Sequence, residues 1–290
     1  MKFEKTYKIV EGPPACKIEE YAVKKNHEYK HLLDTATSEK ELQNFFELNP
    51  SFVPGAWTPS SKSGHYPMHC ALITQPELRG ISTKIPDFMW IAQHSLGWFP
   101  TLIEIENPNK KIFKKDGVPT AEFTQARNQL EKWRTWFSNP SNVQMFLEMY
   151  HVSDSMRNMM QMKLHMILIY GRREEFSQKP HLSKDRMSLT SHDLELMSYD
   201  RLTCDKELSD AITVRLDSNN QYEAVAIPST FKLGPTLSDR LPYIQSINNV
   251  IQANNEISNE RKKFLLERLP YWIRWETTEE RGIIQSCDEE

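Results

Sequence analysis

One stretch, between positions 85 and 108, constrains the fold more than any other because it has the pattern of two strands joined by a short loop. Residues 87–92 (DFMWIA) are apolar and strand-like, and residues 93–97 (QHSLG) have loop character. Residues 98–106 (WFPTLIEIE) resume a strand pattern after an early proline. The pattern predicts a β-hairpin.

The pairing of this hairpin would bring acidic residues together. Reflection about the centre of the loop places Asp87 opposite Glu104, and side chains paired in this way have Cβ atoms roughly 4.5–5.5 Å apart. Glu106 follows two residues after Glu104, so strand alternation puts both on one face, while Ile103 and Ile105 face the other way. Three carboxylates would then converge, and a divalent cation would turn their repulsion into coordination. The alternative is a solvated polar face on an edge hairpin.

The motifs around the hairpin resemble those of known nucleases. Pro86-Asp87 and Glu104-Ile105-Glu106 are similar to the Pro-Asp and Glu-x-Lys signature of the PD-(D/E)XK, or restriction-endonuclease-like, superfamily, with Glu106 where lysine usually stands. Over about residues 38–202 the chain more closely resembles the Shedu family of bacterial antiphage-defence proteins. Five segments carry that likeness in order: 38–50 (SEKELQNFFELNP), 85–90 (IPDFMW), 103–108 (IEIENP), 126–133 (ARNQLEKW) and 169–173 (IYGRR).

The resemblance implies a fold, an activity and a metal. The fold would be α/β, with a mixed restriction-endonuclease-like sheet flanked by helices. The activity would be metal-dependent hydrolysis or nicking of phage or foreign DNA by a homo-oligomer. Asp87, Glu104 and the backbone carbonyl of Ile105 would hold Mg²⁺ or Mn²⁺. As a carboxylate, Glu106 would orient or deprotonate the attacking water, or ligate a second metal.

Two further residues are assigned to the site from the resemblance. Gln129 lies on a predicted helix that starts after Pro119-Thr120, and it would hydrogen-bond near the metal or the DNA backbone. Its alternative role is that of a surface glutamine. Glu41 is a second candidate because an acid on the first helix reaches the metal in several nuclease relatives. However, residues 38–41 (SEKE) form a capping box, and capping is the favoured role of Glu41.

The net charge of −3 argues against DNA binding by a uniformly basic surface, so positive charge must be local. The best candidates directly follow the acidic motif in residues 109–117 (NKKIFKKDG): Lys110, Lys111, Lys114 and Lys115. We interpret them as a DNA-binding turn, and a solvated lysine-rich turn is the alternative. Either Lys110 or Lys111 could fold back to supply the positive charge that Glu106 lacks.

The later part of the chain contains other basic residues. Arg172-Arg173 follows the apolar strand pattern of residues 163–170, and pairing with Glu174 and Glu175 is slightly favoured over phosphate contact. Residues 211–228 predict two strands, and residues 237–275 look helical with interruptions at Pro242 and Pro270. Near the end of this helical segment lies a group of basic and aromatic residues, and its spacing favours packing against the protein over stacking on nucleobases. These are Arg268, Tyr271, Trp272, Arg274 and Trp275.

The predicted organisation is a lead-in (1–37), a nuclease-like domain (38–202) and a strand–helix appendage (203–290). No apolar run approaches the ~20 residues of a membrane span and no signal peptide is evident, so we expect a cytoplasmic protein without a membrane partner. The four cysteines lack Cys-x-x-Cys spacing, which argues against a zinc ribbon. The sequence has no glycine-rich loop of the kind that cradles phosphate, so a nucleotide cofactor is not indicated.

Two other classes of function stay open. A catalytically inactive nuclease fold could serve as a DNA-binding or assembly module, and divalent-metal binding measured by calorimetry would separate it from an enzyme. A glycosidase could use paired acids without metal. Its activity would survive chelation.

Overall fold

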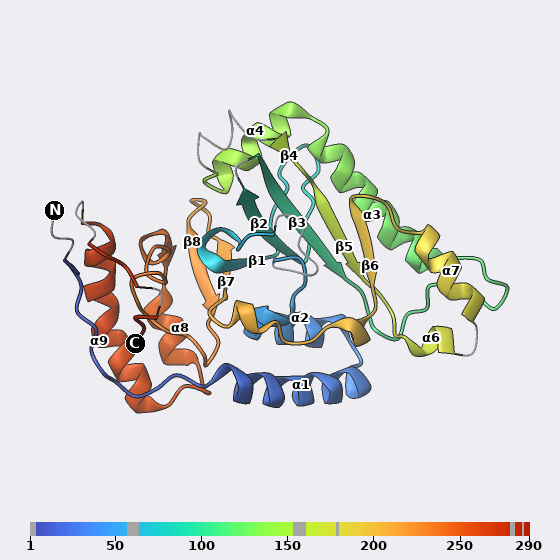
Figure 1. The fold of residues 1–290 in the computed structure, drawn as a ribbon. Helices are drawn as coiled ribbons and strands as arrows, with labels where there is room; N and C mark the ends of the chain where they lie inside the picture. The colour runs from blue at the N-terminus through green and yellow to red at the C-terminus, as the bar shows by residue number, and fades with distance from the viewer. Residues whose placement is uncertain are drawn as a thin grey trace.

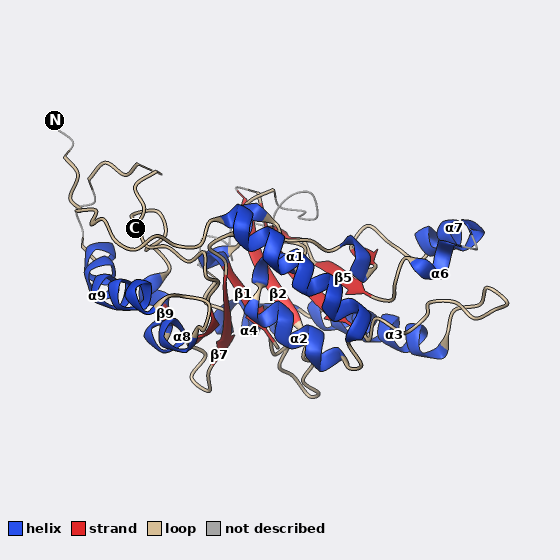
Figure 2. Ribbon diagram, turned by 90° about the horizontal axis from the view of Figure 1, so that it is seen from below, coloured by secondary structure: helices blue, strands red, loops and turns tan. Residues whose placement is uncertain are grey.

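The computed structural model describes residues 4–56, 64–94, 96–152, 161–177, 180–278, 282–285 and 287–290. Across these residues a mixed β-sheet is flanked by helices on both faces (Figures 1 and 2). The predicted α/β class is therefore confirmed. None of the helices in the described ranges is long and apolar enough to cross a membrane.

The sheet of the described residues has the order β6-β5-β3-β2-β1-β7-β8-β9, with the short β4 paired to β3. Strands β3, β5 and β6 run parallel, whereas β2 is antiparallel to both β1 and β3. The strands are β1 (Ala71–Thr74), β2 (Phe88–His94), β3 (Gly97–Ile105), β4 (Gln161–Met162), β5 (His165–Ile169), β6 (Leu194–Met197), β7 (Ile212–Leu216), β8 (Tyr222–Ala226) and β9 (Ile244–Gln245).

The hairpin of β2 and β3 has the predicted register. Phe88 pairs with Ile103 and His94 pairs with Gly97, so the same register places Asp87 opposite Glu104. The connection is shorter than the predicted loop, because backbone pairing continues through the polar residues at the end of β2. Polar side chains do not prevent a ladder that is made by the main chain.

Alternate residues of the hairpin fill two hydrophobic cores. Phe88 and Trp90 belong to a core with α1 (Ile18–Thr35) and α2 (Glu39–Leu48). Met89 and Ile91 belong to a second core with α3 (Ala121–Phe137) and α4 (Pro140–Met149). Since both faces are covered, these strands read as nearly continuous apolar runs.

The C-terminal strands continue the same sheet, since β7 pairs in parallel with β1 and the predicted strands of residues 211–228 are present. Beyond them lie α8 (Ile247–Ala253) and α9 (Asn259–Glu276). The predicted interruption at Pro270 is wrong, because α9 continues through this residue. Trp272 and Trp275 are buried and make ring contacts with Tyr7, which confirms the packing interpretation. The lead-in and the appendage are thus in contact.

Two small helices lie beyond the carboxyl end of β5, at the end of the molecule opposite α9 (Figure 1). They are α6 (Glu174–Ser177) and α7 (Pro180–Ser188). The carboxyl ends of β3, β5 and β6 point toward this side, which is where the acidic residues of the hairpin lie.

Candidate metal centre

The hairpin holds Asp87 and Glu104 side by side at the carboxyl end of β3. The backbone N–H of Ile105 donates to Asp87 Oδ2 at 2.8 Å, which turns the Asp87 side chain across the strand pair. Glu104 is only 7% exposed. In a strand, the N–H and C=O of one residue point to the same side, so the Ile105 carbonyl is directed toward Asp87 as well. Two carboxylates and one carbonyl therefore share one edge.

The environment of these acids disfavours their charged forms. Burial raises the pKa of Asp87 to about 7, with the negative charges of Glu39 and Glu106 adding to it and the Ile105 hydrogen bond opposing it. Burial and the charge of Asp87 raise the pKa of Glu104 well above its usual range. Two adjacent carboxyl groups in such a place do not both ionise unless a cation joins them.

One carboxylate oxygen of the Asp87–Glu104 pair has no hydrogen-bond donor among the described residues. Glu104 Oε1 accepts a hydrogen bond from Gln129 Nε2 at 2.6 Å, whereas Glu104 Oε2 is buried without an N–H or O–H donor in the described part of the chain. A proton shared with Asp87, or a cation, would satisfy this oxygen. Hard oxygen donors suit Mg²⁺ or Mn²⁺, so the residues present fit such an ion.

The third predicted carboxylate does not complete a cage. Glu106 lies just past the end of β3, and its side chain forms an ion pair with Lys110. Among the described residues, no three His, Cys, Asp or Glu side chains are arranged to hold a metal ion. Glu106 lies close enough for its charge to raise the pKa of both Asp87 and Glu104, but the ammonium four residues downstream engages its carboxylate, so the predicted cage of three acids is not formed. The predicted ligands, Asp87, Glu104 and the Ile105 carbonyl, do not include Glu106.

Lys110 folds back toward the acids, as one of the two sequence alternatives proposed. Partial burial acts against its charge, but the hydrogen bond to Glu106 raises the pKa of Lys110. The loop before it is fixed to the segment that precedes α2, since Asn107 Nδ2 donates to Thr37 O at 3.2 Å and Asn109 Nδ2 donates to Ala36 O at 3.4 Å. The site thus has a resident positive charge beside Glu106.

Glu41 has the capping role. Its Oε1 accepts hydrogen bonds from both the backbone N–H and the hydroxyl of Thr37 and Ser38, at 2.8–3.2 Å, and these bonds lower the pKa of Glu41. The acid of α2 that lies near the cluster is Glu39. Burial, followed by the charge of Glu106, raises the pKa of Glu39.

Sequence reasoning missed Glu39 and Tyr199. The capping box contained a signal for Glu39, because Glu41 is used to cap the helix and Glu39 is left available. Tyr199 Oη donates to the Glu106 carbonyl at 2.5 Å, and the Glu106 N–H donates to Ile169 O at 3.1 Å. The backbone of Glu106 is therefore fixed from both sides.

The remaining lysines of the predicted DNA-binding turn, Lys111, Lys114 and Lys115, are exposed. The turn is anchored by Glu175, whose carboxylate accepts from the N–H groups of Ile112 at 3.1 Å and Phe113 at 2.8 Å.

The favoured pairing of Arg172-Arg173 with Glu174 and Glu175 is wrong. Arg172 instead pairs with Asp200 at 2.9 Å and with Asp34 at 3.4 Å. The reason is tertiary: Asp200 follows β6, which lies beside β5 in the sheet.

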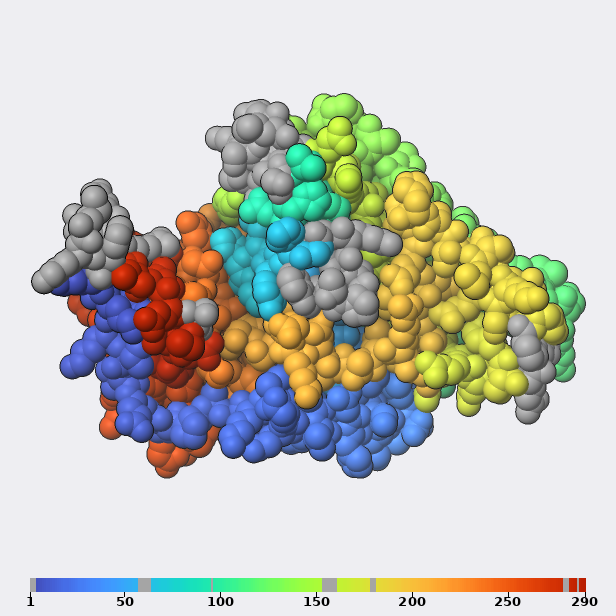
Figure 3. All heavy atoms as spheres, in the orientation of Figure 1, coloured from blue at the N-terminus to red at the C-terminus, as the bar shows by residue number. Residues whose placement is uncertain are grey.

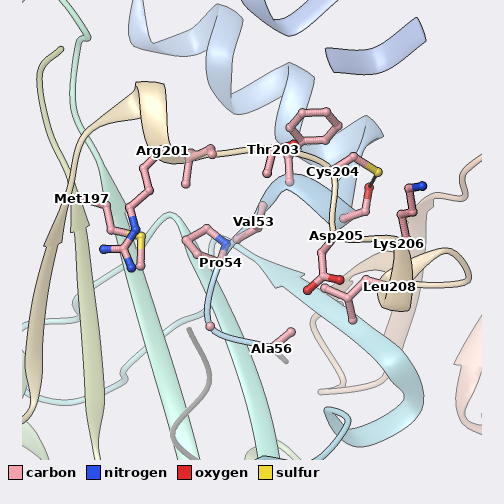
Figure 4. A pocket seen from close by; sticks show the side chains of 14 residues that line it. Val53, Pro54, Ala56, Met197, Arg201, Thr203, Cys204, Asp205, Lys206 and Leu208 are labelled. Carbon is pink, nitrogen blue, oxygen red and sulfur yellow. Dashed lines mark hydrogen bonds between the residues drawn. The ribbon is translucent and has the colours of Figure 1, made fainter. Parts of the chain in front are cut away.

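The cavity in Figure 4 lies apart from the acid pair. It has a volume of about 300 Å³ and is lined by residues 51–56 and by residues between 197 and 208. Arg201 and Lys206 lie at opposite ends of it, and Cys204 Sγ lies 3.5 Å from Ser51 Oγ. Neither Asp87 nor Glu104 lines this cavity.

A comparison with protein families places these residues in context. The family model described as Shedu protein SduA, C-terminal, matches residues 36–203. This range is more than half of the chain, and it contains the β2–β3 hairpin, Gln129 and the strands β5 and β6. No curated protein matches the chain significantly. The chain belongs to the Shedu family.

Proposed function

We propose that this protein is a divalent-metal-dependent deoxyribonuclease of the PD-(D/E)XK type that acts in antiphage defence. The observation that carries the proposal is the acid pair of Asp87 and Glu104. It combines raised pKa values with a buried oxygen that lacks a donor. Membership of the Shedu family supports the defensive role.

In this proposal Asp87, Glu104 and the Ile105 carbonyl hold Mg²⁺ or Mn²⁺. When bound, the ion polarises the scissile phosphate and lowers the pKa of a bound water. Gln129 orients the Glu104 carboxylate by holding Oε1, so that Oε2 is left for the ion. The backbone N–H of Ile105 fixes the rotamer of Asp87 in the same way.

The Glu106–Lys110 pair supplies the functions that the lysine of the Glu-x-Lys signature would supply. The Glu106 carboxylate accepts a proton from the attacking water, and the Lys110 ammonium stabilises negative charge on the phosphate. Both groups are held in place, Glu106 by Tyr199 and β5, and Lys110 by the asparagine-anchored loop.

The direct test is incubation of a supercoiled plasmid with the purified protein and Mg²⁺ or Mn²⁺, with and without a chelator. We expect nicked or linear DNA only when the free metal is present. Calorimetry with the metal alone provides the second measurement. Absence of both metal binding and cleavage would support the inactive DNA-binding module. Metal binding without cleavage would contradict the nuclease activity, and cleavage that survives chelation would exclude the assigned metal role.

A further inference from the structure

A cleft with a concentration of positive charge lies between α7 and β6, the strand at the edge of the sheet. Its volume is about 560 Å³. Three arginines line it, Arg173, Arg186 and Arg201, and Glu195 is the one acid among its described lining residues. In a chain with a net charge of −3, such a cluster is a local exception.

Arg186 is held mainly by neutral groups. Its Nη2 donates to Leu196 O at 2.9 Å, and its guanidinium lies 5.4 Å from the ring centroid of Phe176. Nε is buried without a hydrogen bond, and no described carboxylate forms an ion pair with Arg186. Burial and the nearby charge of Arg201 lower the pKa of Arg186. A partly buried cation in this position favours an anion from outside.

The other two arginines leave charge available. Arg201 forms one ion pair, at 2.8 Å with Glu195, and its side chain is 53% exposed. Arg173 is exposed, and within the described ranges its side chain makes no hydrogen bond or ion pair. The net charge of the three arginines and Glu195 is therefore positive.

The cleft is joined to the metal centre through the lysine-rich turn. A Cβ on Gly171 would lie 2.9 Å from Lys110 O, so the end of β5 contacts the loop that carries Lys110. A Cβ on Gly117 would lie 3.7 Å from Leu182 of α7. Figure 3 shows α6 and α7, in yellow, at one end of the molecule with green residues of the turn beside them. The lysine-rich turn thus packs between the end of β5, beside the acid pair, and α7, which forms one wall of the cleft.

We infer that this cleft binds a backbone phosphate of DNA, away from the scissile one, and so positions the strand across the acid pair. The inference rests on the proposed nuclease function. Guanidinium groups match the geometry of phosphate oxygens, and the hydroxyl groups of Ser183 and Thr190 also line the cleft. No Phe, Tyr or Trp is among its described lining residues. A backbone phosphate therefore fits better than a nucleotide whose base must stack.

The test measures DNA affinity against salt concentration by fluorescence anisotropy, with a labelled duplex and a chelator that prevents cleavage. Arg173→Ala and Arg201→Ala should each reduce the log–log salt slope by up to about one, because each removes one phosphate contact. The matched control is Arg215→Ala on β7, an exposed arginine that pairs with Glu223 at 2.9 Å much as Arg201 pairs with Glu195. This control should keep the wild-type slope.

Wild-type slopes in both cleft variants would overturn the inference, while plasmid cleavage by the wild type would still support the proposed nuclease. A wild type that neither binds nor cleaves DNA would overturn both. A second arm uses inorganic phosphate alone, compared with chloride at equal ionic strength. If phosphate raises the Tm of the wild type but not of the cleft variants, and the DNA slopes match the control, the cleft takes free phosphate and the DNA assignment is wrong.

Discussion

Glu104 and Asp193 are buried to the same degree, at 7% and 8% exposure, yet they differ in the partner that α3 provides. Arg134 of α3 contacts both oxygens of Asp193, at 2.7 and 2.9 Å, near the amino end of β6. Gln129 of the same helix contacts one oxygen of Glu104 at the carboxyl end of β3. One helix thus brings a cation to one end of the sheet and a neutral amide to the other.

The pKa values follow this difference. Burial alone would raise the pKa of Asp193, but the hydrogen bonds from Arg134 and Ser191 hold it at about 2. At the other end, burial raises the pKa of Glu104 and no partner on α3 reverses the effect. The Asp193 end is therefore electrostatically complete, whereas the acid pair requires a proton or an added cation.

The largest expected effect comes from removing a negative charge of the acid pair, at the carboxyl end of β3. Asp87→Asn keeps the shape but weakens a metal ligand, so plasmid cleavage should fall by at least roughly 10³-fold, which corresponds to several kcal/mol of lost stabilisation. Its free energy of unfolding should not decrease, because repulsion with Glu104 is relieved. Cleavage at the wild-type rate would show that Asp87 is not a ligand.

The matched substitution at the other end should show the reverse pattern. Asp193→Asn leaves the Arg134 charge without its carboxylate, and urea denaturation should show a loss of about 2–3 kcal/mol. This is below the value for a fully buried pair because Arg134 is partly exposed. Metal affinity measured by calorimetry should stay unchanged. A loss of metal binding in this variant would contradict the assignment of metal binding to the acid pair and of a purely structural role to Asp193.

The next effect concerns Glu106, whose charge Lys110 balances. Glu106→Gln should lower the cleavage rate by roughly 10²–10⁴-fold, the usual contribution of general acid–base catalysis. Glu106→Lys should not exceed the wild-type rate, because it places a second ammonium beside Lys110. An unchanged rate in Glu106→Gln, together with a more active Glu106→Lys, would contradict the water-activating role.

Local patterns predicted much of the frame. The two apolar runs and the short loop between them predicted the register that places Asp87 opposite Glu104, because a short hairpin connection fixes which residues face each other. The capping box likewise predicted where α2 starts.

The rest depends on packing between distant segments. Tyr199 reaches Glu106 only because η3 (Tyr199–Arg201) follows β6, two strands away from β3. Arg172 finds Asp200 for the same reason. The direction of the Glu106 side chain also could not be read from strand alternation, since β3 ends one residue before it.

A further effect should appear in the pH dependence of stability without metal. The folded pKa of Asp87, about 7, lies above its unfolded value of about 3.9, so the folded state binds more protons between these values. The free energy of unfolding should therefore fall as pH rises from about 4 to 7, by up to about 1.4 kcal/mol per pH unit for one proton.

Urea denaturation in chelator across this pH range provides the measurement. The decline should be smaller in Asp87→Asn, where the raised pKa of Glu104 still contributes, and should be reversed by Mg²⁺ in the wild type. Asp193 has the opposite sign, since its depressed pKa contributes stability that is lost as pH falls from about 4 to 2. Equal pH profiles for wild type and Asp87→Asn would show that the pKa of Asp87 is not raised.

The smallest expected effect is in the lysine-rich turn, where the three lysine side chains are exposed. Changing Lys111, Lys114 and Lys115 to Ala should reduce the log–log salt slope of DNA binding by up to about three, one per lost phosphate contact. Lys110 is left intact because it pairs with Glu106, so the rate at saturating DNA should change little.

The control for this prediction is the triple change of Lys8, Lys262 and Lys263 to Ala, which removes the same charge from the end of the molecule that carries α9. If both triple variants reduce the slope equally, the turn acts only through net charge. A larger reduction in the turn variant would locate the DNA path beside the acid pair. It would also extend the comparison, because negative charge that α3 leaves uncompensated would then lie next to positive charge that contacts phosphate.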